Sequence, residues 1–379
     1  MPEPITVHKD SEFFISIAKK GVHSFIMVGV MINGHPEILA RVGKGNLIDK
    51  QFGVRCTNRF TIFGKNIFHH SDASLLDEFD FDKNRMIGLS YQSYSITLKQ
   101  YKEFIAITRD IHHNQLAHYQ DRNDPVGEDK YLTYPELGVR KLRQGISCYI
   151  PEDEEGGQVT FTYKNIHSFN EISTLRSEQE RQQIIARSKE INASNTCRTT
   201  AYDLLQYPLP YAPKVPSLFL MELDYKTTLS CSKLNPGTFY ILPPPPNCFQ
   251  LNPTQMKVLE KLYKKLEDLP KKQSGSDVTR KKFEALKQLY KELAGEPQLS
   301  LTNLLEKITL HRKANHDLFN EKRDQCLFSK FVEAVGFKIN SGTQRTYDQM
   351  EKDLKEEIHH QTDACTQQNM ETVAAPMSI

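Results

Sequence analysis

An α+β domain followed by an all-α helical region is the fold class that this sequence predicts. Up to about residue 210, β-rich apolar runs alternate with helical patterns. A proline-rich stretch with four consecutive prolines comes next, and such prolines adopt an extended conformation. Lysine- and glutamate-rich helical patterns fill the rest. We therefore expect a first domain over 1–210, a proline-rich connection over 211–253, a helical partner-binding domain over 254–360 and a flexible C-terminal tail over 361–379.

A β-hairpin is the clearest signal in the first domain. Residues 22–31 are almost continuously apolar, Asn33-Gly34 follows as a type I′ turn signal, and residues 37–43 are the predicted return strand. With this turn at the tip, residues whose numbers add up to 67, as 33 and 34 do, face each other. His23 is then opposite Lys44. The same face is expected to carry Phe25, Met27, Ala40 and Val42, with Asn46 one step further along.

The remaining elements follow from the same two periodicities. Runs of β-branched and aromatic residues predict further strands at 56–64, 86–97, 145–150 and 158–163. Helical spacing of apolar residues predicts helices at 98–116 and 174–192, and a short helix that begins after Cys197 and stops before Pro208. The second region has the pattern of a helical bundle, with predicted helices at 254–268, 276–294, 299–315 and 344–358.

Composition favours a globular protein without a metal site or a cofactor. The seven cysteines include no C-x-x-C pair, which argues against zinc and thioredoxin-type motifs and suits a reduced compartment. Adjacent histidines occur at 69–70, 112–113 and 359–360. Neighbouring side chains point apart on a strand or a helix, however, and no carboxylate or cysteine completes a metal-ligand set.

Charge and hydropathy narrow the expected partners. The net charge of +2 gives no indication of nucleic-acid binding, and the basic clusters are matched by nearby glutamates, so membrane-surface contact is not indicated either. The chain does not open with a basic segment followed by an apolar one, and no apolar run reaches the roughly 20 residues that span a bilayer. We expect a cytoplasmic protein, or one secreted into a host cell without a cleaved signal peptide.

Cys197 is the candidate nucleophile. Asn195 and Thr196 are capping residue types, so Cys197 begins a helix, where the helix dipole and the free N–H groups stabilise a thiolate. Arg198 adds a positive charge, and the first-turn N–H groups could bind an oxyanion. A cysteine at a helix start is also a common packed residue without any catalytic role.

His23 is the candidate base for this thiol. It opens a strand that is otherwise almost entirely apolar, a position where a titratable imidazole meets the exposed end of a buried face. Asn46 falls on the same predicted face and could orient the ring through a hydrogen bond. A histidine at a strand end also occurs simply as a polar cap.

The segment HSFIMVGV, followed by a hairpin and much later by NASNTCRTTAYDLL, resembles the permuted papain-like cysteine hydrolases. These include NlpC-type peptidases, lecithin:retinol acyltransferase-like proteins and the PPPDE desumoylating peptidases. The resemblance implies an antiparallel sheet packed on helices, with a histidine opening its first strand and a cysteine opening a later helix, here His23 and Cys197. The long interval between the two departs from the simplest members. His35 has the spacing of a second histidine in the acyltransferase branch, but the predicted turn puts it beside the hairpin tip.

The chain as a whole resembles effectors of intracellular bacteria such as Legionella, which join a small enzyme domain to charged helices and end in a glutamate-rich stretch, here EKDLKEE at 351–357. Three functions remain open. The first is a thiol hydrolase that cleaves an amide or isopeptide bond in a host protein. The second is a thiol acyltransferase or phospholipase acting on lipid esters. The third is a non-catalytic effector that binds a host protein through its helical half.

Overall fold

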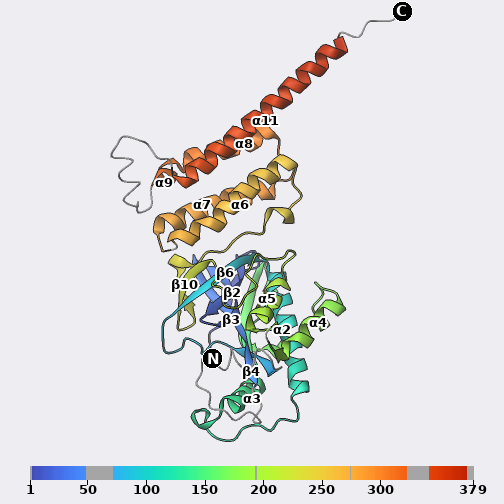
Figure 1. Ribbon diagram of the computed structural model, residues 1–379, viewed down its shortest axis with the longest axis vertical. Helices are drawn as coiled ribbons and strands as arrows, with labels where there is room; N and C mark the ends of the chain where they lie inside the picture. Colours follow the sequence, from blue (N-terminus) through green and yellow to red (C-terminus); the bar gives the residue numbers. More distant parts are fainter. Residues whose placement is uncertain (1, 48–70, 193, 274, 322–340, 374–379) are drawn as a thin grey trace, which may run out of the picture. The chain divides into compact units, whose positions relative to one another are not determined.

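The computed structural model describes the chain except for residues 1, 48–70, 193, 274, 322–340 and 374–379 (Figure 1). It divides into two compact units, Met1–Ile241 and Leu242–Ile379. The predicted strand at 56–64 and the histidines at 69–70 lie outside the described residues.

The first unit is a mixed α/β structure with two antiparallel sheets. Eight strands form the larger sheet in the order β11-β10-β6-β2-β3-β4-β5-β9, and three form the smaller one in the order β1-β8-β7. The larger sheet contains β2 (Phe13–Lys20), β3 (His23–Ile32), β4 (His35–Leu47), β5 (Ser71–Asp77), β6 (Ile87–Ile96), β9 (Glu190–Ile191), β10 (Tyr225–Ser230) and β11 (Lys233–Leu234). The smaller sheet contains β1 (Ile5–His8), β7 (Ser147–Glu155) and β8 (Gln158–Asn165).

Helices pack on one face of the larger sheet. Four α-helices belong to the described part of this unit, namely α2 (Leu98–His118), α3 (Tyr134–Gln144), α4 (Glu178–Ser188) and α5 (Cys197–Gln206). Phe13 of β2 is fully buried against Tyr101 of α2, with ring centroids 6.2 Å apart. Alternate residues of β2 and β3 form this buried layer, so the sheet gives α5 a rigid base.

Two strands precede the predicted hairpin, so β3 is not the first strand of the sheet. β2 pairs with both β3 and β6 and puts β3 in the interior of the sheet. The predicted strands at 86–97, 145–150 and 158–163 correspond to β6, β7 and β8. The proline-rich stretch 211–253 also contributes to the larger sheet, because β10 pairs with β6 and β11 pairs with β10.

The hairpin register changes along its length. Near the tip the pairing follows the prediction, with Ile32 opposite His35 and Gly29 opposite Ile38. An irregularity between Val28 and Gly29 then shifts the pairing by one residue, so Phe25 lies opposite Gly43. The expectation that Lys44, Ala40 and Val42 share the face of His23 and Phe25 is therefore wrong. A bulge in the middle of a hairpin exchanges the two faces beyond it.

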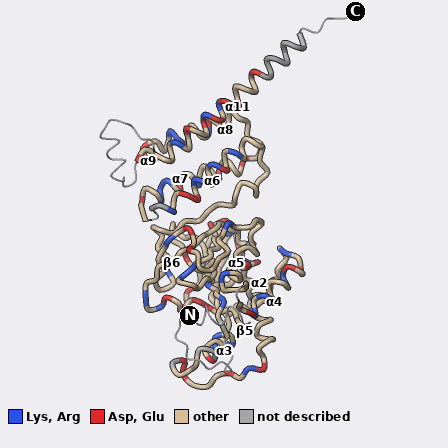
Figure 2. The backbone as a smooth tube through the Cα atoms, in the orientation of Figure 1, with Lys and Arg blue, Asp and Glu red and all other residues tan. Residues whose placement is uncertain are grey.

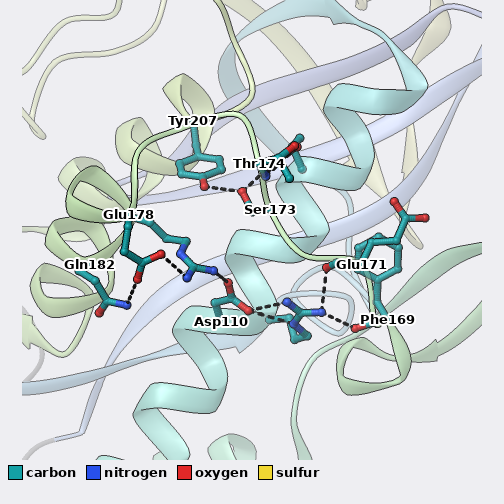
Figure 3. Close-up of polar contacts among 11 residues, drawn as sticks. Asp110, Phe169, Glu171, Ser173, Thr174, Glu178, Gln182 and Tyr207 are labelled. Carbon is teal, nitrogen blue, oxygen red and sulfur yellow. Dashed lines mark hydrogen bonds and ion pairs between the residues drawn. The ribbon is translucent and has the colours of Figure 1, made fainter.

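A strap over residues 169–176 ties α2 to the far end of α5 (Figure 3). The Glu103 carboxylate of α2 accepts hydrogen bonds from Ser173 Oγ at 2.6 Å and from the Thr174 N–H at 3.1 Å. Ser173 also hydrogen-bonds the Tyr207 hydroxyl at 2.5 Å, directly after α5. Arg109 holds the beginning of the strap by donating to the Phe169 carbonyl at 2.6 Å. The C-terminal end of α5 is thus fixed through buried polar contacts.

The second unit is a set of charged helices with a leucine- and tyrosine-rich interior. It contains α6 (Pro253–Gln273), α7 (Asp277–Gly295), α8 (Leu301–Ala314), α9 (His316–Asn320) and α11 (Gly342–Val373). Buried residues such as Leu262, Leu286 and Tyr290 lie inside it, and basic and acidic residues are interspersed along its helices (Figure 2). Helix α11 continues to Val373, so residues 361–373 of the expected flexible tail are helical.

Candidate thiol site

Cys197 is the first residue of α5. Thr196 is the N-cap, with extended backbone angles, and its side-chain oxygen accepts a hydrogen bond from the Arg198 N–H at 3.2 Å. The Cys197 Sγ lies 3.4 Å from the Ser24 backbone nitrogen, which donates to it, and 3.6 Å from the Val22 carbonyl oxygen. The thiol is therefore held between the first turn of a helix and the start of β3.

His23 reaches the same place from the sheet. It is the first residue of β3, follows a turn in which Gly21 has a φ of +59°, and leaves 27% of its side chain exposed. Its ring stacks against Phe25 at a centroid distance of 5.7 Å and also packs against Phe81. The imidazole and the Cys197 thiol are close enough for each to shift the pKa of the other. The fold thus joins two residues that lie far apart in the sequence.

Glu78 is the third member of the site. Its Oε1 lies 2.8 Å from His23 Nε2, and its side chain is 12% exposed. The residue directly follows β5, and its backbone N–H donates to the Arg41 carbonyl at 3.0 Å. Because Nε2 is paired with Glu78, Nδ1 is the ring nitrogen that remains for Cys197. A carboxylate behind an imidazole fixes its tautomer and orientation.

A glycine makes room for the His23–Glu78 pair. A Cβ atom at Gly43 would lie 2.3 Å from Glu78 Oε1 and 3.0 Å from His23 Nε2. The register shift in the hairpin brings this glycine, rather than Val42 or Lys44, into the row beside Phe25. The bulge is therefore what opens space for the carboxylate.

The electrostatics favour an ion pair between the thiol and the imidazole. Burial alone lowers the pKa of His23, but the Glu78 carboxylate and the interaction with Cys197 outweigh it and raise the pKa to about 10. Burial alone raises the pKa of Cys197. The interaction with His23 and the Ser24 and Arg198 N–H groups outweigh burial, so the pKa lies below its ordinary value. Both shifts stabilise a thiolate beside an imidazolium.

The loop before Cys197 is fixed by a buried lysine. Lys44 Nζ donates to Asn195 Oδ1 at 3.0 Å and to the Arg187 carbonyl at 3.2 Å. The Asn195 amide nitrogen donates to the carbonyls of Arg187 at 2.6 Å and of Glu190 at 3.0 Å. Burial lowers the pKa of Lys44 to about 8, against the opposing charges of Cys197 and Asp203. Asn195 therefore supports the thiol by bracing its loop.

Arg198, expected to add charge beside the thiol, has a buried side chain whose charge interacts with Cys197. Its Nη2 donates to the Met221 carbonyl at 2.8 Å. Asn46, expected to orient His23, belongs to β4 opposite Ala73, three residues beyond Gly43, and its side chain lies outside the described residues. The position behind the imidazole is occupied by Glu78 instead. Its sequence signal is the acidic run that contains Asp77, Glu78, Asp80 and Asp82.

Other polar groups in the described part of the chain do not gather into a metal centre. Among those residues, no group of three or more histidines, cysteines, aspartates or glutamates is arranged to hold a metal ion. His112 Nδ1 lies 2.9 Å from His167 Nε2, and His112 Nε2 donates to the Leu142 carbonyl at 3.1 Å. Burial lowers the pKa of His112 to about 4, which keeps this pair neutral and structural.

No helix in the described ranges is both long enough and apolar enough to cross a bilayer. Comparison of the whole chain with protein-family models, with curated proteins and with solved structures gave no match.

Proposed function

We propose that this protein is a thiol hydrolase that cleaves an amide or isopeptide bond. Cys197 is the nucleophile, His23 the general base and acid, and Glu78 the residue that orients His23. The observation that carries the proposal is the His23–Glu78 pair, with Nε2 and Oε1 2.8 Å apart, beside a Cys197 thiol whose pKa the imidazole lowers. Nucleophilic thiol catalysis requires a thiol, a base and a group that orients the base, and three elements remote in sequence supply these groups here.

The reaction runs in two halves. The Cys197 thiolate attacks the substrate carbonyl carbon, and the first turn of α5 stabilises the negative oxygen through its dipole and N–H groups. The His23 imidazolium gives its proton to the leaving amine as the carbon–nitrogen bond breaks and a thioester forms. Water then attacks the thioester while His23 takes a proton from it, which releases the carboxylic acid and restores the thiolate.

A permuted papain-like identity for the first unit is part of the proposal. Its support is the order of the parts, with the histidine at the start of an interior antiparallel strand and the cysteine at the start of a later helix packed on the same sheet. The third position differs from the asparagine expected from sequence, because a glutamate lies behind the histidine. We assign recognition of a protein partner to the helices of the second unit.

The first test compares the reactivity of the thiols. At pH 6, iodoacetamide should alkylate Cys197 ~10-fold faster than the exposed Cys231, because the pKa of Cys197 is lowered and the thiolate is the reacting form. Mass spectrometry of tryptic peptides gives both rates in one sample. His23→Ala should reduce the rate at Cys197 and leave that at Cys231 unchanged. Equal rates at the two cysteines in the wild-type protein would contradict the proposal.

The second test asks for hydrolase chemistry. A peptide vinyl sulfone, which traps a catalytic thiolate by conjugate addition, should label the wild-type protein and leave Cys197→Ala unlabelled. Glu78→Gln should be labelled more slowly than wild type, because the imidazole is no longer held and charged. Labelling that persists unchanged in Cys197→Ala would remove Cys197 from the site. A lipid-ester hydrolase would instead turn over short-chain thioesters or phospholipid vesicles in preference to peptides.

A further inference from the structure

The segment 209–224, which we call the return segment, runs back along α5 toward the thiol. The Leu209 N–H donates to the Gln206 carbonyl at 3.1 Å, at the C-terminal end of the helix. The Tyr202 hydroxyl donates to the Pro213 carbonyl at 3.5 Å, one turn earlier. Arg198 then donates to the Met221 carbonyl at 2.8 Å, in the turn that begins with Cys197. The last part of the return segment therefore lies beside the thiol end of α5.

This end of the return segment is anchored to the sheet. Glu222 forms an ion pair with the buried Lys19 of β2 at 3.2 Å, and the Leu223 N–H donates to Ser90 Oγ of β6 at 3.2 Å. Lys19 is paired in the sheet with Ser24, the residue whose N–H donates to Cys197 Sγ. The lysine that anchors the return segment and the serine that donates to the thiol are thus paired residues on two adjacent strands.

The anchored turn exposes its apolar side chains. Leu218, Leu220 and Met221 are 64%, 52% and 50% exposed, although the Met221 N–H closes the turn on the Leu218 carbonyl at 3.1 Å. Val22, whose carbonyl lies 3.6 Å from Cys197 Sγ, is 38% exposed. Large apolar side chains exposed together on a hydrogen-bonded turn near a candidate reactive group are typical of a binding site.

We infer that the turn 218–221, together with Val22, binds an apolar side chain of the acyl group that Cys197 attacks. The inference rests on the proposed function and names its substrate class, an acyl group with a bulky aliphatic residue next to the scissile carbonyl. The position of this surface next to the thiol selects the occupant. Arg198 donates to the Met221 carbonyl of the turn, and the preceding residue, Cys197, contacts the Val22 carbonyl. An acyl group bound by Cys197 would then extend from the first turn of α5 toward these apolar side chains.

Two peptide vinyl sulfones that differ only in leucine or serine beside the reactive group test this surface. The measured quantity is the second-order rate constant for labelling of Cys197 by each probe. The wild-type protein should prefer the leucine probe by ~10-fold or more, the discrimination that apolar pockets typically provide. Leu220→Ser and Met221→Ser should each reduce this ratio toward one, while the rate with iodoacetamide, which has no such side chain, stays unchanged.

Ile172→Ser is the matched control. Ile172 is 71% exposed and precedes Ser173, which contacts Tyr207 at the opposite end of α5. It should leave the leucine-to-serine ratio at the wild-type value. A wild-type protein without a preference for leucine, or a preference that survives both substitutions in the turn, overturns the inference. If Cys197 reacts with iodoacetamide no faster than Cys231, the proposed function fails instead, so the two failures are distinct.

Discussion

At the scale of single residues, the charge state of the site depends on Glu78. Burial opposes a charged imidazole, yet the pKa of His23 is raised from 6.5 to about 10 because the carboxylate and the thiol favour the proton. The folded protein therefore binds this proton more tightly than the unfolded chain does. The resulting contribution to stability is complete below pH 6.5 and is lost as the pH rises through 10.

Substitution of Glu78 should change the titration of His23. In Glu78→Gln the shape is kept but the negative charge is removed, so the pKa of His23 should fall by roughly one to three pH units. Nuclear magnetic resonance of the labelled imidazole measures this directly. Asp80→Asn, which removes an exposed carboxylate two residues away, is the control and should leave the titration in place. An unchanged pKa in Glu78→Gln would show that the carboxylate does not set the charge of the imidazole.

Gly43 should tolerate no side chain. The Cβ of Gly43→Ala would lie 2.3 Å from Glu78 Oε1, so the carboxylate must leave His23. We expect vinyl sulfone labelling of Cys197 to slow by ~10-fold or more, since a positioned acid and base contributes ~10²–10⁴-fold. Gly88→Ala is the matched control, because a Cβ at this position in β6 meets no atom within 4 Å. Equal labelling rates for the two alanine variants would argue against the close packing around Glu78.

At the scale of elements, α5 is held at both ends by buried polar contacts. The strap fixes its C-terminal end through Ser173 and Tyr207, and Lys44 fixes the loop that leads into its first turn. Removal of the Lys44 donor takes away the hydrogen bond to the buried Asn195 Oδ1, and a buried acceptor that loses its donor costs ~1–3 kcal/mol. The position of the Cys197 thiol should therefore depend on Lys44, although the hydrogen bonds that Lys44 donates go to the preceding loop and not to the thiol.

Lys44→Met tests this bracing role. The variant keeps the apolar stem but removes the hydrogen bonds to Asn195 and to the Arg187 carbonyl. Hydrogen exchange of the backbone amides over 187–197 should accelerate, while exchange within α2 stays as in the wild type. Lys20→Met, which changes an exposed lysine at the end of β2, should affect neither region. Normal protection of 187–197 in Lys44→Met would mean that the loop is held by other contacts.

The hairpin shows how far the sequence determines an element. Asn33-Gly34 and the flanking apolar runs locate the turn and both strands, because turn chemistry and periodicity are local properties. The irregularity between Val28 and Gly29 has a weaker local signal, a single glycine inside the strand, yet it decides which residues face His23. Strand β2, Phe13–Lys20, which was not predicted from the sequence, is a nearly continuous apolar run without clear alternation, and it moves the histidine into the interior of the sheet.

At the scale of the whole molecule, the two units contribute differently to the proposed activity. Every residue of the thiol site and of the return segment belongs to Met1–Ile241. A protein of residues 1–241 should therefore fold and keep the iodoacetamide reactivity of Cys197, which the same mass-spectrometric assay measures. Loss of that reactivity in a fragment with normal circular dichroism would indicate that the helical unit completes the site.

Cys197 and His23, the candidates chosen from sequence, and Glu78, which sequence reasoning did not select, differ in the signals around them. Cys197 has capping residues before it, and His23 opens an apolar strand, so each is visible within a few positions. Glu78 acquires its role only when β4 and β5 pair and bring it to a histidine 55 positions earlier. Its neighbours in β5, SDASLLD, have weak strand propensity, so the strand that delivers it cannot be recognised locally.

The separation between the Ser24 N–H and the Cys197 sulfur has a consequence for biosynthesis. The two groups are 173 positions apart, so neither the Ser24 N–H nor the nearby His23 can stabilise the thiolate until nearly the whole first unit has left the ribosome and closed on itself. A nascent chain carries an ordinary, protonated cysteine at this position. The proposed thiolate–imidazolium pair therefore forms only in the finished fold, so an incomplete or misfolded copy would lack the proposed activity.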